Sequence, residues 1–332
     1  MTDDIKVSVF CIAFNHEKYI RQALQSVVAQ KTNFKYEILV HDDASTDGTA
    51  EIIMEFAEKY PDLIIPIIQT ENQYSKRINI SNTHLRPRAR GKYIATCECD
   101  DFWVDENKLQ QQYDVMENNP EISMCVHKVV GVNEDGTPNA LVHPEEKYGI
   151  NGSGYISQNE FADYILLKGG YPFHTSSYFR KVDWKTEKVI TGLPKYLNGD
   201  QRILYAALND GPIYYIDKVM SHRRLMAIGS YNSRLVQKSD AERFQIFINS
   251  IMAEIDFDKL SDKKFHKKIV ESVYLHFFFF FRTRDIKMTK KYFKKVQKQL
   301  AFDWKISKGL NAKYLLMKIC PSIIPMVFNR NK

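Results

Sequence analysis

Two clusters of carboxylates are the residues best suited to chemistry in this chain. One occupies residues 42–43 (Asp-Asp) and the other residues 98–101 (Glu-Cys-Asp-Asp), and each follows an apolar run that predicts a buried strand. Carboxylates gathered at strand ends repel one another unless a positive charge lies between them. The pattern therefore predicts a divalent cation at this position, with a phosphate group as a further ligand.

The elements that carry these clusters follow an α/β pattern. In chain order we expect strand 7–14, helix 17–30, strand 36–40, helix 49–60, strand 63–68 and strand 91–99. Strands that alternate with helices predict an α/β fold with a mainly parallel sheet flanked by helices. Ligands bind beyond the carboxyl ends of such strands, so residues 14–16, 42–43 and 98–100 are expected to converge at one edge.

The pattern is less regular after Trp103. We expect helix 108–118, strand 122–132, a turn at 133–136, a loop at 148–155, helix 158–167, strand 175–180, a helix from Gly199 to about Ala207, strands 213–216 and 219–225, and only helices from about Lys238. The chain is therefore expected to end in a helical extension.

Charge is distributed unevenly along the chain. The whole chain carries a formal charge of +7, but residues 259–332 contain 19 Lys and Arg against 4 Asp and Glu. The preceding residues contain 28 basic against 36 acidic residues, so an acidic body carries a basic tail. The hydrophobic content of 44% is that of an ordinary globular protein. Such a tail predicts a negatively charged partner, either a membrane surface or a nucleic acid.

The cysteines indicate a reducing compartment. They are Cys11, Cys97, Cys99, Cys125 and Cys320. No second Cys/His pair stands at a zinc-like spacing from residues 97 and 99, so we expect buried reduced thiols and a cytoplasmic protein. Residues 1–6 lack the apolar segment of a signal peptide. The longest uncharged apolar run, residues 273–281, is too short to span a membrane.

Four segments, in order, resemble those of the family 2 glycosyltransferases, inverting enzymes of the GT-A type that use nucleotide-sugar donors. They are Ala13–His16, Asp42–Thr49, Gly91–Ala95 and Glu98–Trp103. The resemblance covers residues 5–230 and implies a GT-A type, Rossmann-like α/β fold. We expect a catalytic domain at 1–235, with a nucleotide-sugar half at 1–105 and an acceptor half at 106–235. A basic helical extension follows at 236–332.

The resemblance implies a nucleotide site at the ends of the first two strands. Phe14, with Asn15 beside it, would lie against the base, where an aromatic face gains stacking energy. Asp42 or Asp43 would accept hydrogen bonds from the base and the ribose, and Asp43 is favoured for the base. The implied nucleotide is UDP.

Glu98-Cys99-Asp100 matches the acidic-x-Asp motif of the family. The resemblance implies that Asp100 ligates Mg²⁺ or Mn²⁺ at the diphosphate, with Glu98 directed toward the ribose or the metal. Such hard cations prefer oxygen ligands. The bound cation would neutralise the charge that develops on the departing diphosphate.

Inverting transfer also needs a base that takes the proton of the attacking acceptor hydroxyl. In related enzymes this is an Asp at the start of a helix well after the metal motif, and Gly199-Asp200 matches that place and context. Asp200 is therefore the predicted base. His174 either faces the acceptor or is a hydrogen-bonded structural histidine, the interpretation that we favour.

One departure from the family concerns its Tyr-Arg-x-His segment, whose His approaches the metal or the diphosphate. Arg224 fits this pattern, but Met226 stands where the His is expected. Either His222 compensates from a shifted register, or Arg223 and Arg224 bind the diphosphate directly as a charge clamp. We favour the two arginines.

These observations predict metal-assisted transfer of a hexosyl or N-acetylhexosaminyl group to a saccharide acceptor, expected to be lipid-linked, in surface glycan biosynthesis. One alternative is a binding or scaffold protein that has kept the fold without turnover, which Met226 would favour. The other is a sugar nucleotidyltransferase. That class is expected to carry a Gly-rich phosphate loop near the N-terminus, whereas residues 7–30 contain no glycine.

The basic tail contains an amphipathic pattern over residues 288–300. Apolar side chains share one helical face, and five lysines lie beside them. The segment suits either an anionic membrane, here the inner face of the plasma membrane, or a helical bundle that docks on the catalytic domain or forms a homodimer. A nucleic-acid partner is not expected, because the tail lacks a recognisable binding module.

Overall fold

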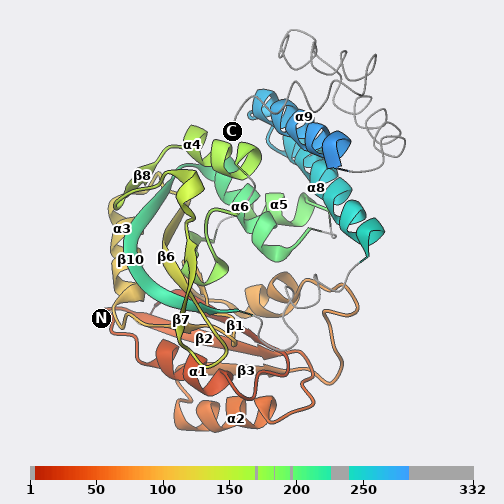
Figure 1. The fold of residues 1–332 in the computed structure, drawn as a ribbon. Helices are drawn as coiled ribbons and strands as arrows, with labels where there is room; N and C mark the ends of the chain where they lie inside the picture. Colours follow the sequence, from red (N-terminus) through yellow and green to blue (C-terminus); the bar gives the residue numbers. More distant parts are fainter. Residues whose placement is uncertain (1–3, 169–170, 183, 195–196, 226–238, 284–332) are drawn as a thin grey trace, which may run out of the picture.

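The computed structural model describes residues 4–168, 171–182, 184–194, 197–225 and 239–283 (Figure 1). Within these residues ten strands form one sheet, in which the order β3-β2-β1-β4-β9-β6-β10-β5 is extended by β7 beside β6 and β8 beside β10. The strands are β1 Ile5–Ala13, β2 Lys35–Asp42, β3 Ile64–Ile68, β4 Tyr93–Thr96, β5 Phe102–Trp103, β6 Met124–Val132, β7 Pro138–His143, β8 Gly154–Ile156, β9 Phe179–Lys181 and β10 Ile213–Arg224.

Helices cover both faces of the sheet. The α-helices are α1 Ile20–Val28, α2 Thr49–Lys59, α3 Lys108–Asn118, α4 Gln158–Ala162, α5 Trp184–Gly192, α6 Gly199–Asp210, α8 Asp240–Leu260 and α9 His266–Thr283. The shorter helical turns are η1 Ser81–Leu85, η2 Arg86–Arg88, η3 Glu146–Tyr148, η4 Asp163–Leu167 and η5 Thr175–Ser177. In Figure 1, α1 and α2 lie beneath the first strands, and α4 to α6 lie at the opposite end of the molecule.

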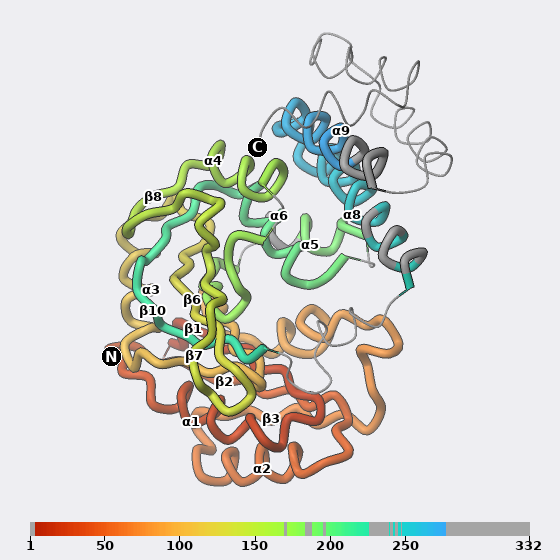
Figure 2. The backbone as a smooth tube through the Cα atoms, in the orientation of Figure 1, coloured from red at the N-terminus to blue at the C-terminus, as the bar shows by residue number. Residues whose placement is uncertain are grey.

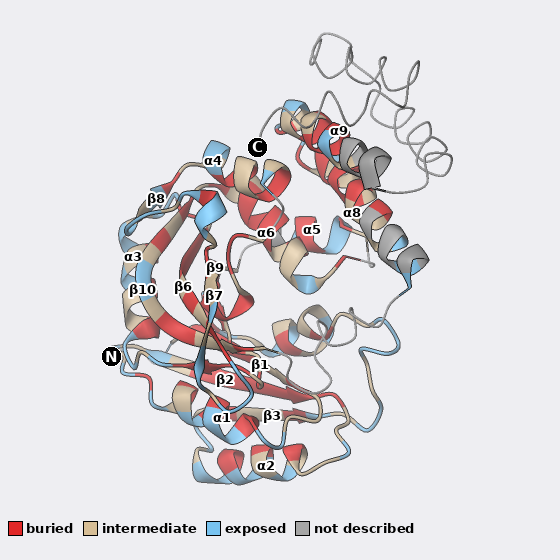
Figure 3. Cartoon of the chain, in the orientation of Figure 1, coloured by how far each residue is buried: buried red, intermediate tan, exposed pale blue. Residues whose placement is uncertain are grey.

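The first half of the sheet is parallel, as the alternation of apolar runs predicts. β1 pairs with β2 on one side and with β4 on the other, and β2 pairs with β3, all in parallel. On one face of these strands, apolar side chains such as Val9, Val40 and Ile64 are buried against α1 and α2, whose outer faces are exposed (Figure 3). Because these strands run in one direction, the acidic residues that follow them emerge at one edge of the sheet.

The second half of the sheet is mixed. β9 pairs antiparallel with β4 and β6, while β6 and β10 run parallel. Two strands were expected at 213–216 and 219–225, but β10 is one continuous strand. Its ladder with β6 shifts register between Ile216 and Val219 and again between Val219 and Ser221. Such irregularities bend a strand without ending it, and the tube in Figure 2 follows this long curve.

Two other local expectations differ from the structure. The expected loop at 148–155 leads into the short strand β8, because Gly154 and Tyr155 pair with the edge of β10. In the expected strand at 175–180, residues 175–177 form a turn of 3₁₀ helix, and only the stretch from Phe179 continues as β9. This turn is important because it faces the acidic motif.

The helices α8 and α9 pack against helices of the second half of the molecule, α8 against α5 and α9 against η4. Ile251 and Phe257 of α8 and Val273 of α9 belong to the same hydrophobic cluster as residues of β6, α6 and β10. Figure 1 shows the two helices side by side at one end of the molecule. The basic residues beyond 283, including the predicted amphipathic segment, lie outside the described residues.

Candidate active site

The loop after β1 is tied to the loop after β2. Asn15 has a positive φ of 55°, a conformation that Asn adopts more readily than most residues. Its backbone N–H donates to Ser45 Oγ at 2.8 Å, and its side-chain oxygen accepts from the N–H of Thr46 at 2.8 Å. The buried Asp42 accepts from both the N–H and the hydroxyl of Ser45. Asp42 and Asn15 therefore shape the loops at this edge.

Asp43 orders a more distant loop. Its carboxylate accepts the backbone N–H of Gln73 at 2.7 Å and that of Tyr74 at 3.1 Å, and its carbonyl accepts from the Asn72 side chain at 3.1 Å. Phe14, the predicted base-stacking residue, is only partly buried at the end of β1. The predicted nucleotide residues thus gather at the carboxyl ends of β1 and β2.

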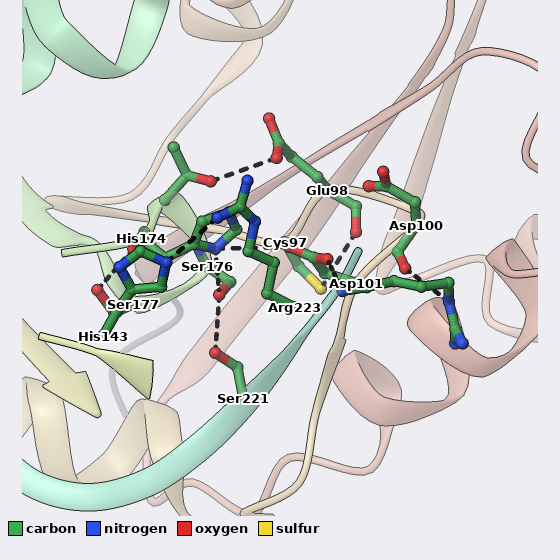
Figure 4. A network of polar contacts seen from close by, with 12 residues as sticks. Cys97, Glu98, Asp100, Asp101, His143, His174, Ser176, Ser177, Ser221 and Arg223 are labelled. Atoms are coloured by element: carbon green, nitrogen blue, oxygen red, sulfur yellow. Dashed lines mark hydrogen bonds and ion pairs between the residues drawn. The ribbon is translucent and has the colours of Figure 1, made fainter. Parts of the chain in front are cut away.

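The acidic motif follows β4 and leads into β5 (Figure 4). Glu98 accepts a hydrogen bond from the Thr175 hydroxyl at 3.3 Å. The buried Asp101 accepts from the backbone N–H of Arg224 through Oδ1 at 2.8 Å, while its Oδ2 has no hydrogen-bond partner and lies 3.6 Å from Nδ1 of His174. Within the described residues the carboxylate of Asp100 accepts no hydrogen bond. Two carboxylates of the motif therefore keep oxygens available for a ligand.

The protonation of these carboxyl groups reflects their crowding. Burial raises the pKa of Glu98 to about 8, and the negative charges of Asp200 and Asp100 add to that shift. Burial also raises the pKa of Asp101, again with contributions from Asp100 and Glu98. The charge of Arg223 opposes the shift in both groups. The site is thus short of positive charge, as expected where a cation binds.

Asp200 lies in the first turn of α6, where the helix N-terminus favours a negative charge. Burial nevertheless raises its pKa to about 6, against the lowering effects of its own backbone N–H and of Arg223. Its charge reaches Glu98 and raises that pKa. The structure therefore brings Asp200, from the second half of the sheet, next to the acidic motif from the first half.

The two consecutive arginines of β10 differ in their surroundings. Arg224 is buried and donates to backbone carbonyls of Asp100, Asn133 and Glu134, as well as to the Gln22 side chain. Its guanidinium also lies 4.8 Å from the ring centre of Tyr19. Arg223 is only partly buried, and one hydrogen bond joins it to His143 Nε2 at 3.2 Å. The guanidinium of Arg224 is thus hydrogen-bonded to other parts of the protein. Arg223 instead faces the carboxylates of Glu98 and Asp101.

One group of side chains in the described residues has the spacing of a metal site. Ligand atoms of Glu98, Asp101 and His174 lie within 4.8 Å of one another. The unpartnered Oδ2 of Asp101 fits a cation at this point. The motif predicts Asp100 and Glu98 as ligands, so the two sets share Glu98 and differ in the others. Carboxylate and imidazole ligands together suit Mn²⁺ better than Mg²⁺.

Several residues at the site were not singled out by the sequence. Thr175, Ser176 and Ser221 are ordinary polar residues in the sequence, but Thr175 contacts Glu98 and the hydroxyls of Ser176 and Ser221 lie 2.8 Å apart. His143 stands beside Arg223, and its ring lies tilted by 31° against that of His174, with the ring centres 5.7 Å apart. No local spacing reveals these contacts, because they join elements far apart in the chain. His222, the alternative to Met226, instead packs edge-on against Phe102.

The comparisons with known proteins agree with this arrangement. The model of the family "Glycosyl transferase family 2" matches residues 8–186, more than half of the chain. This chain belongs to glycosyl transferase family 2. Within the family, it is 39% identical over 138 residues to an uncharacterized protein of Mycobacterium tuberculosis, a stretch that covers 42% of this chain and 39% of the relative.

Family 2 relatives of known or suggested role are less similar. The chain is 32% identical over 145 residues to WfgD of Escherichia coli, a UDP-Glc:alpha-D-GlcNAc-diphosphoundecaprenol beta-1,3-glucosyltransferase; the match covers 43% of this chain and 53% of WfgD. It is 30% identical over 142 residues to TuaG of Bacillus subtilis, a putative teichuronic acid biosynthesis glycosyltransferase. This match covers 42% of this chain and 53% of TuaG. The matches thus span about half or less of these relatives' length.

Solved structures confirm the GT-A type fold. S. aureus TarS in complex with UDP-GlcNAc superposes with a TM-score of 0.63 at 17% identity, covering 92% of this chain and 83% of TarS. The mannosyltransferase PcManGT from Pyrobaculum calidifontis, in complex with GDP-Man and Mn²⁺, superposes with a TM-score of 0.50 at 16% identity. The superposition covers 97% of this chain and 89% of PcManGT. At such low identity these structures establish the fold of this family 2 member and nothing further.

Two further expectations can be compared with the structure of this family 2 chain. Cys11, Cys97, Cys99 and Cys125 are buried and unpaired, as expected of reduced thiols. Within the described residues, no helix combines the length and the apolar content that crossing a membrane requires. Met226 and Cys320 lie outside the described residues, so the place of the missing family histidine stays a prediction from sequence.

Proposed function

We propose that this family 2 protein is a metal-assisted inverting glycosyltransferase that takes a sugar from a nucleotide diphosphate, with UDP as the expected carrier. The observation that carries this proposal is the meeting of Glu98, Asp101 and Asp200 around Arg223. The matched relatives that act on UDP-Glc or bind UDP-GlcNAc support the donor class. Whether the sugar is a hexosyl or an N-acetylhexosaminyl group is part of what the test decides.

Asp200 is the proposed base. With a pKa of about 6 it is mostly ionised at neutral pH, yet basic enough to take a proton from an attacking hydroxyl. Its place at the start of α6, opposite the acidic motif, suits an acceptor that enters between the two halves of the sheet. The proton leaves the acceptor oxygen for an oxygen of Asp200 as the acceptor oxygen bonds to the anomeric carbon. The bond from this carbon to the diphosphate oxygen breaks, and the nucleoside diphosphate leaves with the electron pair.

Asp100 and Glu98 are the proposed ligands of Mn²⁺ or Mg²⁺, and Asp101 and His174 stand close enough to contribute. When bound, the cation supplies positive charge to the departing diphosphate. Arg223 lies among the same carboxylates and is the proposed second cation at the diphosphate. The proposal does not extend to Arg224, because its guanidinium binds protein carbonyls.

Phe14, Asn15, Asp42 and Asp43 are proposed to form the nucleotide side of the site. Asp43 would act on the base while it holds the loop at Gln73 and Tyr74, since each carboxylate oxygen has a second lone pair. The proposed acceptor is a saccharide on a lipid carrier, used in surface glycan biosynthesis. A cytoplasmic location, at the inner face of the plasma membrane, accompanies this proposal.

The test is a panel of sugar nucleotides. Purified full-length protein is incubated with UDP-Glc, UDP-Gal, UDP-GlcNAc or GDP-Man, with Mn²⁺ or Mg²⁺, and with lipid-linked and free saccharide acceptors. We expect release of the nucleoside diphosphate from one donor, an inverted anomeric configuration in the product, and loss of both with the Asp200→Asn variant. If no donor is consumed in any combination while a nucleotide still binds, the chain is a binding or scaffold protein instead.

A further inference from the structure

The turn η5 (Thr175–Ser177), with His174 just before it, supplies two of the contacts that reach the acidic motif from the second half of the chain. Arg224 of β10 supplies others. Thr175 donates to Glu98, and His174, just before the turn, faces Asp101. The hydrogen bonds inside this segment, from the N–H of Ser177 and of Tyr178, close only the turn itself. Its position relative to the motif must therefore be set by groups outside it.

Gln112 of α3 supplies one such group. Its buried side-chain amide donates to the carbonyl of Ser177 at 2.8 Å and to the carbonyl of Cys125 in β6 at 3.1 Å. Both N–H bonds of the amide are thus used, and they join the end of the turn to the sheet. The side chain is fully buried, so water cannot replace these bonds.

Lys108 fixes the orientation of that amide. Its ammonium group donates to Gln112 Oε1 at 2.7 Å and lies 4.0 Å from the ring centre of Trp103. An amide can rotate to exchange its oxygen and nitrogen, but only one orientation offers the oxygen to Lys108 and both N–H bonds to the carbonyls. A fully buried lysine costs free energy of desolvation, so its presence suggests a task beyond packing.

The contacts form a closed ring that joins the end of the acidic motif to the turn. Trp103 lies two residues after Asp101 and pairs with Ser221 of β10, and Ser221 contacts Ser176 of the turn. The other side of the ring runs from Trp103 through Lys108 and Gln112 back to the turn. We infer that Lys108 and Gln112 are positioning residues that hold Thr175 and His174 against Glu98 and Asp101. This role rests on the proposed function, because Glu98 and Asp101 belong to the proposed active site.

The experiment uses the full-length chain with Lys108→Met, Gln112→Leu and the double variant. Gln110→Leu is the matched control, because Gln110 lies on the same helix but bonds only exposed partners, the Asp114 carboxylate and the N–H of Asn33. Hydrogen exchange is followed in the peptide that contains residues 174–178, with the β2 peptide as an internal reference. Turnover and donor KM are measured with the sugar nucleotide that the panel identifies.

We expect exchange in residues 174–178 to be about tenfold faster in both single variants, with β2 and the control unchanged. Turnover should fall about tenfold or more with little change in donor KM, since small displacements of reacting groups cost rate. The double variant should lose no more than either single variant, because the two residues act as one unit. If Gln112→Leu does not fold, Lys108→Met carries the test, because methionine keeps much of the length of the side chain and removes the desolvation cost of the buried amine.

Unchanged exchange in a folded variant, unchanged turnover, or a double variant that loses the product of the two single effects would overturn the inference. A wild-type chain that consumes no donor would instead count against the proposed function. The exchange measurement would still decide whether Lys108 and Gln112 hold the turn.

Discussion

The two acidic clusters lie at neighbouring strand ends, but their carboxylates have different partners. After β2, each carboxylate oxygen of Asp42 and Asp43 accepts a hydrogen bond from a nearby loop. After β4, the Asp100 carboxylate has no hydrogen bond within the described residues, and Oδ2 of Asp101 has none either. We therefore call Asp42 and Asp43 the saturated cluster and residues 98–101 the unsaturated cluster.

This difference separates carboxylates that hydrogen bonds from the protein already stabilise from carboxylates whose oxygens can still bind a cation. Burial raises the pKa of Asp42, but two hydrogen bonds from Ser45 oppose that shift. Glu98 has only the Thr175 hydroxyl and the charge of Arg223 to oppose its burial and the negative charges of Asp200 and Asp100, and its pKa reaches about 8. Hydrogen-bond donors stabilise the ionised form of a carboxyl group, so the first cluster needs no cation while the second does.

The largest effect is expected at the unsaturated cluster. Asp100→Ala should reduce transfer by about a thousandfold, because several kcal/mol of charge stabilisation at the diphosphate is lost with the cation. Calorimetric titration with Mn²⁺ should show weaker binding, and the circular dichroism spectrum should not change. Asp62→Ala, at an exposed position, is the control.

Two companion variants decide which residues hold the cation. If Asp101→Asn and His174→Ala lose Mn²⁺ binding while Asp100→Ala keeps it, the ligands are Glu98, Asp101 and His174. Normal transfer by Asp100→Ala would remove the distinction between the two clusters.

The next effect concerns Asp200, which completes the unsaturated cluster from across the sheet. Asp200→Asn should lower turnover by about a hundredfold, the usual scale for a lost general base, and leave donor binding near normal. In the wild type, kcat should fall as the pH drops through about 6, because protonated Asp200 cannot accept the hydroxyl proton. The variant should lack this acidic limb. Unchanged turnover would place the base elsewhere.

The sequence predicts the first half of the molecule better than the second. Local apolar patterns predict strands such as Ile5–Ala13 and helices such as Thr49–Lys59. Parallel pairing of the strands then brings their carboxyl ends together. The partners of the carboxylates are not local, because Asp43 bonds to Gln73 and Tyr74 and Asp101 meets His174. The turn at Thr175–Ser177 looks like a strand in sequence, and only tertiary contacts show its role.

A smaller effect on transfer is expected at the saturated cluster. Asp42→Asn replaces a carboxylate oxygen that accepts from Ser45 by an amide nitrogen that cannot, and one buried donor loses its partner. We expect a loss of about 1–3 kcal/mol in the free energy of unfolding, measured in urea. Because Asp42 is also a proposed nucleotide residue, transfer should fall through a higher donor KM, but much less than in Asp100→Ala, under conditions where the protein stays folded. A loss of transfer equal to that of Asp100→Ala would show that saturation does not separate the clusters.

The smallest effect on transfer is expected at Glu254 of α8, which tests whether a poorly partnered carboxylate is by itself a sign of function. Its Oε2 has no hydrogen-bond partner, and burial raises its pKa to about 8, although Ser272 of α9 opposes the shift. An acid whose pKa is higher in the folded state loses stability as the pH rises from its unfolded pKa near 4.5 to about 8.

Glu254→Gln should abolish this dependence. Its free energy of unfolding should match that of the wild type at pH 4.5 and exceed it by about 1–3 kcal/mol at pH 9, with transfer unchanged. Asp256→Asn, two residues further along α8 and paired with Lys259, should show the same pH dependence of unfolding as the wild type. If Glu254→Gln impairs transfer as Asp200→Asn does, a buried carboxylate oxygen without a hydrogen-bond partner is by itself a sign of a residue needed for transfer. If only stability responds, charge crowding from Asp100, Asp200 and Arg223 is what distinguishes the active site.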